Sequence, residues 1–75
     1  MKNYDLCIID ANSAIKLDKK YVKAYHRRGK AQMELNKHED ALADFEYIME
    51  LEPQNAEANA DLMNCRESYN REMKK

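Results

Sequence analysis

The chain has 75 residues, 36% of which are charged, and a formal net charge of −1. A chain of this length forms one small domain at most, and it buries only about 60% of the surface that its unfolded state exposes. We therefore expect marginal stability. The nearly balanced charge argues against nucleic-acid binding, because nucleic-acid-binding domains are usually more basic. No apolar stretch is long enough to predict a membrane span or a signal peptide.

Apolar residues recur at helical spacing, and only one glycine and one proline interrupt them. This pattern predicts an all-α fold of about four helices, with turns at 18–20, at 36–37 and around Pro53. The expected helices cover about 3–17, 21–35, 38–50 and 56–73.

Each of the first two helices has a face that must pack against a neighbour. The first carries a stripe made by Tyr4, Ile8, Ala11 and Ile15, widened by Cys7 and Ala14. In the second, Gly29 lies beside Tyr25 on the packed face. A glycine inside a helix costs about 1 kcal/mol relative to alanine. We therefore expect another helix to approach closely at Gly29.

The third and fourth helices are joined by a proline-containing turn. Ala41, Phe45 and Ile48 form the inner stripe of the third helix. Pro53 prevents that helix from continuing, and Asn55 is a suitable N-cap for the next one. The fourth helix repeats apolar or small residues at Ala58, Leu62, Cys65 and Tyr69.

Charge is distributed unevenly along the chain. Residues 19–30 hold six basic residues and no acidic one. One face of the second helix combines positions i, i+3, i+4, i+7 and i+11, which are Lys23, His26, Arg27, Lys30 and Glu34. Such a face suits an acidic peptide or a phosphate, and a solvated surface is the alternative. We expect Arg28 to be structural and the acidic residues of the third helix to be solvated, namely Glu39, Asp40, Asp44 and Glu46.

Five residues follow the spacing of one tetratricopeptide (TPR) repeat: Tyr25, Gly29, Ala41, Phe45 and Pro53. The chain therefore resembles the TPR family, whose repeats are antiparallel helical hairpins. A shift of about 34 residues, the length of one repeat, brings the flanking helices into the same register. The resemblance implies a partial TPR domain over 1–75, with the second helix of a preceding repeat (3–20), one complete repeat (22–55) and a capping helix (56–74).

The run from Leu17 to Gly29 is similar to the third repeat of carboxylate-clamp TPR domains. These occur in co-chaperones, including Hsp-organising proteins, serine/threonine protein phosphatase five and RNA-polymerase-associated proteins. The resemblance implies binding of the acidic C-terminal tails (Glu-Glu-Val-Asp) of heat-shock chaperones. Lys23 and Arg27 match the clamp residues that hold the terminal Asp, and Arg is able to grip a carboxylate through two parallel hydrogen bonds. His26 and Lys30 lie beside them and are expected to contact the peptide.

The remaining clamp residues of that family lie on helices that would precede Met1. We therefore expect the chain to be a fragment of a longer domain, with helices supplied by a second chain as the alternative. Without a partner, the Tyr4, Ile8 and Ile15 stripe would be exposed, and exposed apolar faces tend to associate. This predicts self-association or helix exchange between copies. A structural scaffold without a carboxylate ligand, and a phosphatase-linked parent, both remain open.

The residues give no sign of an enzyme. No Ser/His/Asp set, Gly-rich phosphate loop or catalytic carboxylate pair can be assembled, so neither catalytic residues nor cofactors are predicted. His26 and His38 have no cysteine or carboxylate at ligand spacing, so no metal site is predicted and His38 is expected to pack. Cys7 and Cys65 are expected to be buried, free thiols in a reducing setting, cytoplasmic or nuclear.

Overall fold

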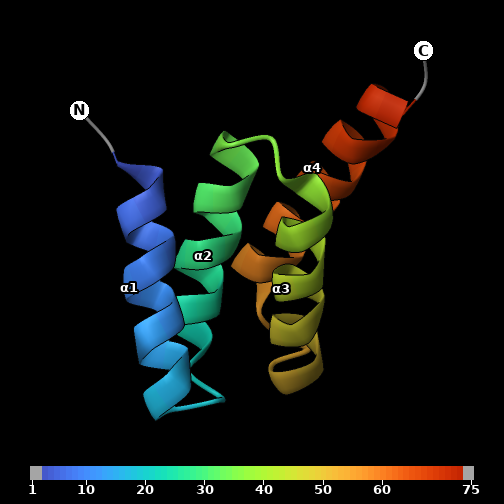
Figure 1. The fold of residues 1–75 in the computed structure, drawn as a ribbon. Helices are drawn as coiled ribbons and strands as arrows, with labels where there is room; N and C mark the ends of the chain where they lie inside the picture. The colour runs from blue at the N-terminus through green and yellow to red at the C-terminus, as the bar shows by residue number, and fades with distance from the viewer. Residues whose placement is uncertain (1–2, 74–75) are drawn as a thin grey trace.

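The computed structural model describes residues 3–73, which form four helices: α1 (Tyr4–Leu17), α2 (Val22–Glu34), α3 (His38–Leu51) and α4 (Ala56–Met73). Consecutive helices run in opposite directions, and α4 passes behind α2 and α3 (Figure 1). The predicted all-α fold is confirmed, and each helix begins and ends within one residue of its predicted position. The assignment of these helices to repeats remains a prediction, and the last residue of the predicted capping segment lies outside the described range.

Short polar side chains set where the helices begin and turn. The Asn3 side chain accepts a hydrogen bond from the Leu6 amide at 3.1 Å and caps α1. The turn after α2 places Asn36 at a φ of 62°, a left-handed conformation that asparagine tolerates better than most residues. Asn55 accepts from the Ala58 amide at 3.0 Å, which confirms it as the cap of α4.

The core lies between α3 and α4. Its buried cluster consists of Ala41, Phe45, Ile48, Ala58, Leu62 and Cys65. Gly29 of α2 completes it, because a Cβ atom at this position would lie 2.8 Å from the Phe45 ring. The close helix approach that we expected at Gly29 is therefore confirmed, and its partner is α3.

Three predictions of burial were wrong or only partly right. Asp44, expected in solvent, is 5% exposed and forms an ion pair with Arg28. Cys7, expected to be buried, is exposed, whereas Cys65 is buried as predicted. Tyr4, Ile8 and Ile15 are half-buried rather than exposed. The exposed large apolar side chains of α1 are Leu6, Ile9 and Leu17.

None of the four helices combines the length with the apolar character needed to cross a membrane, as far as residues 3–73 are concerned.

Candidate functional site

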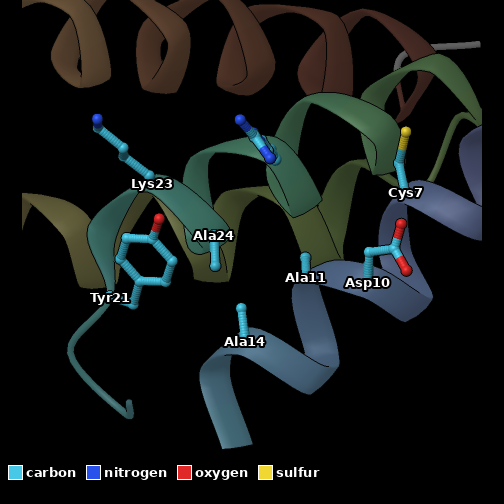
Figure 2. Close-up of a pocket in the computed structure, with 8 residues that line it drawn as sticks. Cys7, Asp10, Ala11, Ala14, Tyr21, Lys23 and Ala24 are labelled. Atoms are coloured by element: carbon cyan, nitrogen blue, oxygen red, sulfur yellow. The ribbon is translucent and has the colours of Figure 1, made fainter. Parts of the chain in front are cut away.

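A small hollow of about 120 Å³ lies between α1 and α2. It is lined by Cys7, Asp10, Ala11 and Ala14 from α1, by Tyr21 at the N-cap of α2, and by Lys23, Ala24 and Arg27 from α2 (Figure 2). The alanines bring the two helices close together, and charged side chains surround the hollow. Lys23 and Arg27, one turn apart on α2, therefore border the same space, with Asp10 as an acidic neighbour.

A larger groove of about 700 Å³ lies beside this hollow and is shared by α1, α2 and α4. Its lining includes His26, Arg27 and Lys30 from α2, with Tyr4 and Cys7 on one side. Asp61 and Asn64 of α4 line it as well, and Glu34 adds a further acidic group. Because Arg27 lines both spaces, the predicted basic face is continuous from Lys23 to Lys30.

The three long cations of this face have no partner within the part of the chain that the structure describes. Lys23, Arg27 and Lys30 are all exposed, and neither an ion pair nor a side-chain hydrogen bond engages them among residues 3–73. A cation without an internal partner is available to an external anion. The structure thus places these three predicted residues together, without a direct ion-pair partner among residues 3–73.

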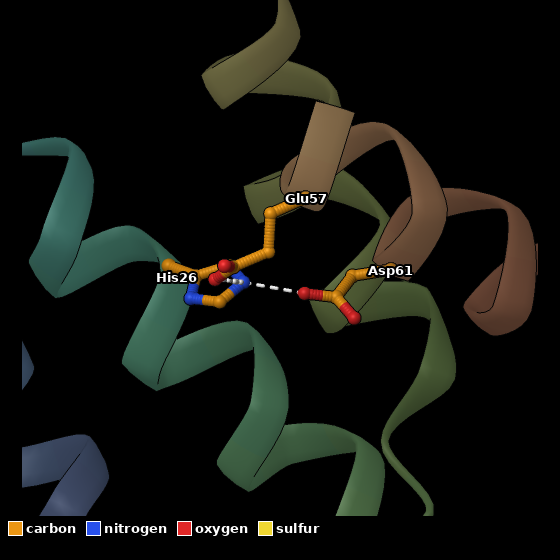
Figure 3. Close-up of side chains that lie close together, drawn as sticks. All are labelled: His26, Glu57 and Asp61. Carbon is orange, nitrogen blue, oxygen red and sulfur yellow. Dashed lines mark hydrogen bonds and ion pairs between the residues drawn. The ribbon is translucent and has the colours of Figure 1, made fainter. Parts of the chain in front are cut away.

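His26, the fourth predicted residue, is placed differently. It is half-buried, and its Nε2 atom is hydrogen-bonded to the Asp61 carboxylate, with Glu57 Oε1 at 3.6 Å (Figure 3). The expectation that no carboxylate joins this histidine was wrong, because only spacing along the chain was considered. Glu57 and Asp61 are four residues apart on α4, so they share one face, and that pattern was the available signal.

Arg28 lies on the opposite side of α2 and has a structural role, as predicted. The Arg28 guanidinium donates two hydrogen bonds to Asp44 and one to Asn12 Oδ1 at 2.8 Å, and so connects α2 with both α3 and α1. The hydrogen bonds to Asp44 raise the pKa of Arg28, so the guanidinium stays charged. Since α2 is held from this side, its basic face is presented on a fixed element.

Sequence comparisons connect the chain with known proteins. Residues 22–55 match the family model described as tetratricopeptide repeat. RNA polymerase II-associated protein 3 of Mus musculus is 47% identical over 62 residues, which are 83% of this chain and 9% of the mouse protein. Serine/threonine-protein phosphatase 5 of Homo sapiens is 39% identical over 62 residues, again 83% of this chain and 12% of the relative. The chain thus spans only a small part of these relatives.

Solved structures share the helix arrangement. The first TPR of Spaghetti (RPAP3), bound to the HSP90 peptide SRMEEVD, superposes with a TM-score of 0.80 at 42% identity, covering 83% of this chain and 49% of that chain. The first TPR domain of the human RPAP3 protein superposes with a TM-score of 0.85 at 39% identity, covering 88% of this chain and 52% of that chain.

Proposed function

Because the chain belongs to the tetratricopeptide repeat family, we propose that it forms part of a co-chaperone module that binds the acidic C-terminal tails of heat-shock chaperones. The observation that carries this proposal is the Spaghetti domain, whose structure holds the HSP90 peptide SRMEEVD. The cations Lys23, Arg27 and Lys30 support it, because they have no direct ion-pair partner among residues 3–73 and offer an anionic peptide a basic face.

The spacing of these cations suits the last residues of such a tail. Lys23 and Lys30 are seven positions apart, or about 10 Å along a helix. An extended peptide covers about 3.3 Å per residue, so this length accommodates about three residues. Lys23 and Arg27 would hold the terminal Asp, which carries two carboxylates. Lys30 would face an acidic residue further upstream, with His26 at the edge of the same groove.

Peptide titration tests the proposal. We expect labelled SRMEEVD to bind the module of which the chain forms part, and to bind the isolated chain weakly or not at all. Within that module, Lys23→Ala or Arg27→Ala should weaken binding by about 2–5 kcal/mol, because each removes one partner of a charge pair. Added salt should weaken binding further. Lys37→Ala is a matched control, since Lys37 lies in the turn after α2, outside both spaces.

The peptide's carboxylate provides the discriminating control. An amidated SRMEEVD peptide lacks the terminal charge, so it should bind much more weakly than the free acid. Equal binding of the two peptides, or binding that ignores both the Lys23 and Arg27 substitutions, would sink the proposal.

A scaffold that binds partners through apolar helix faces is the second candidate. It is favoured by Leu6, Ile9 and Leu17, which are 54%, 56% and 91% exposed on α1. Binding through this face would be insensitive to salt and to the α2 substitutions, because it buries apolar surface rather than charge.

A further inference from the structure

Three potential metal ligands converge where α4 meets α2. His26 Nε2 and one carboxylate oxygen each from Glu57 and Asp61 all lie within 4.8 Å of one another. Figure 3 shows both carboxylates directed from α4 toward the imidazole on α2. We propose that these three residues bind a divalent transition-metal ion of the Zn²⁺ type. The proposal does not rest on peptide binding, although His26 and Asp61 line the groove that the peptide would occupy.

The local structure holds the ligands in place. Asn55 caps the N-terminus of α4, and Glu57 and Asp61 lie one turn apart on that helix. The fully buried Phe45 ring meets the His26 ring edge to face, with centroids 5.8 Å apart and planes at 63°. The imidazole plane is thereby fixed by packing, as a ligand on a rigid element should be.

The donor set suits zinc. Imidazole nitrogen and carboxylate oxygen are ordinary Zn²⁺ ligands at about 2.0–2.2 Å, and three protein ligands plus one water complete a tetrahedral site. Ligand atoms of such a site are about 3.3 Å apart, close to the 3.6 Å between His26 Nε2 and Glu57 Oε1. The Glu57 side chain is 78% exposed, so it is free to adjust. The Asp61 carboxylate is hydrogen-bonded directly to His26 Nε2, so these two groups must move apart to admit the ion.

The charge balance also favours a cation. Two carboxylates face one imidazole, so the cluster carries a net negative charge whether or not the imidazole is protonated. Without a metal, the same three groups form an ion pair only when the imidazole is protonated. Zn²⁺ binds the neutral imidazole instead, so metal and proton compete for the same nitrogen. A bound ion would join α4 directly to α2, whereas α4 otherwise packs chiefly against α3.

Zinc titration calorimetry of the chain with Cys7→Ser tests the site, since this substitution removes the one exposed thiol of residues 3–73. At a pH of about 7.5, we expect one Zn²⁺ to bind per chain and to raise the thermal midpoint reversibly, with EDTA restoring the original value. Asp61→Asn and His26→Gln keep a side chain similar in shape to the original. Each should weaken Zn²⁺ binding at least about tenfold, because even the loss of a residue that only supports a metal ligand has an effect of that size.

The matched control is Glu67→Gln, which removes an exposed α4 carboxylate that pairs with Arg71 instead. This variant should bind Zn²⁺ like its parent. Circular dichroism without metal verifies that each variant is folded, and if His26→Gln is not, Asp61→Asn alone decides. Absence of binding, or binding that Asp61→Asn leaves unchanged, would overturn the proposal and leave the cluster as an ion pair.

Discussion

The Arg28 guanidinium holds both carboxylate oxygens of Asp44, with Nε 2.9 Å from Oδ2 and Nη2 2.6 Å from Oδ1. The Asp44 side chain is only 7% exposed and that of Arg28 is 23% exposed. This parallel pair of bonds crosses from α2 to α3, within the segment 22–55 that matches the TPR family. We therefore infer that this ion pair helps to fix the angle between α2 and α3.

Removing the two partners should have unequal effects. Arg28→Ala strands a buried carboxylate, and we expect it to lower the free energy of unfolding by about 2–4 kcal/mol. Asp44→Asn leaves a guanidinium that still reaches Asn12 and water, so about 1–2 kcal/mol is expected. Urea unfolding measures both changes in the free energy of unfolding.

Arg66→Ala is the control, because the ion pair of Arg66 with Glu46 is exposed and should contribute less than about 1 kcal/mol. Equal, small losses at all three positions would contradict the assignment.

Gly29 offers a test of close packing between α2 and α3. Helix propensity alone predicts that Gly29→Ala stabilises the chain by about 1 kcal/mol. The added Cβ would lie 2.8 Å from two atoms of the Phe45 ring. Phe45 is fully buried, so its ring has no free space to move into. We therefore expect a net loss of about 1–3 kcal/mol in the free energy of unfolding.

A double substitution separates the clash from other effects. Phe45→Leu shortens the side chain opposite Gly29, so Gly29→Ala should cost less in that background than in the parent chain. A higher unfolding midpoint for Gly29→Ala alone would show that the Phe45 ring moves to make room for the methyl group. The close approach of α2 to α3 at Gly29 would then not limit stability.

Sequence reasoning recovered the parts of the fold that depend on local periodicity. The helix boundaries, the cap at Asn55 and the close approach at Gly29 all follow from the chemistry of single positions. Burial of Asp44 was missed although its spacing gave a signal. It lies three residues after Ala41 and four before Ile48, on the buried stripe, and only its polar character hid this.

Contacts between distant segments were the part that the sequence could not provide. The approach of Asp61 to His26 depends on how α4 crosses α2, which no local pattern specifies. Cys7 was expected to be packed because it widens the apolar stripe of the first helix. Within the described residues α1 packs against α2 alone, so that position is uncovered and the thiol is exposed.

The two cysteines should differ sharply in reactivity. Cys7 is exposed, whereas Cys65 has no exposed surface and its burial raises the pKa of the thiol. A raised pKa means that less thiolate, the reactive form, is present at any given pH. We expect one thiol to react rapidly with a disulfide reagent in the native chain. Cys65 should react at least about 100-fold more slowly, because it requires local opening.

One variant and one denaturant assign the labelling phases. Cys7→Ser should abolish the fast phase, and urea should convert the slow phase into a fast one. Two rapid thiols in the native chain would indicate that α4 opens readily from α3, contrary to the packing of Cys65.

The apolar face of α1 should cause self-association. Leu6, Ile9 and Leu17 project from one side of the helix and are 54%, 56% and 91% exposed. A second copy of the chain presents the same face, so pairing buries both surfaces at about 25 cal/mol per Å² of apolar area. Sedimentation velocity should show a mean mass that rises with concentration.

Leu6→Glu combined with Ile9→Glu should keep the chain monomeric, because it places two charges in the contact. Met63→Glu, at a position of α4 that is 61% exposed, is the control and should associate like the parent. A chain that stays monomeric at high concentration while remaining helical would show that this face does not bind a second copy.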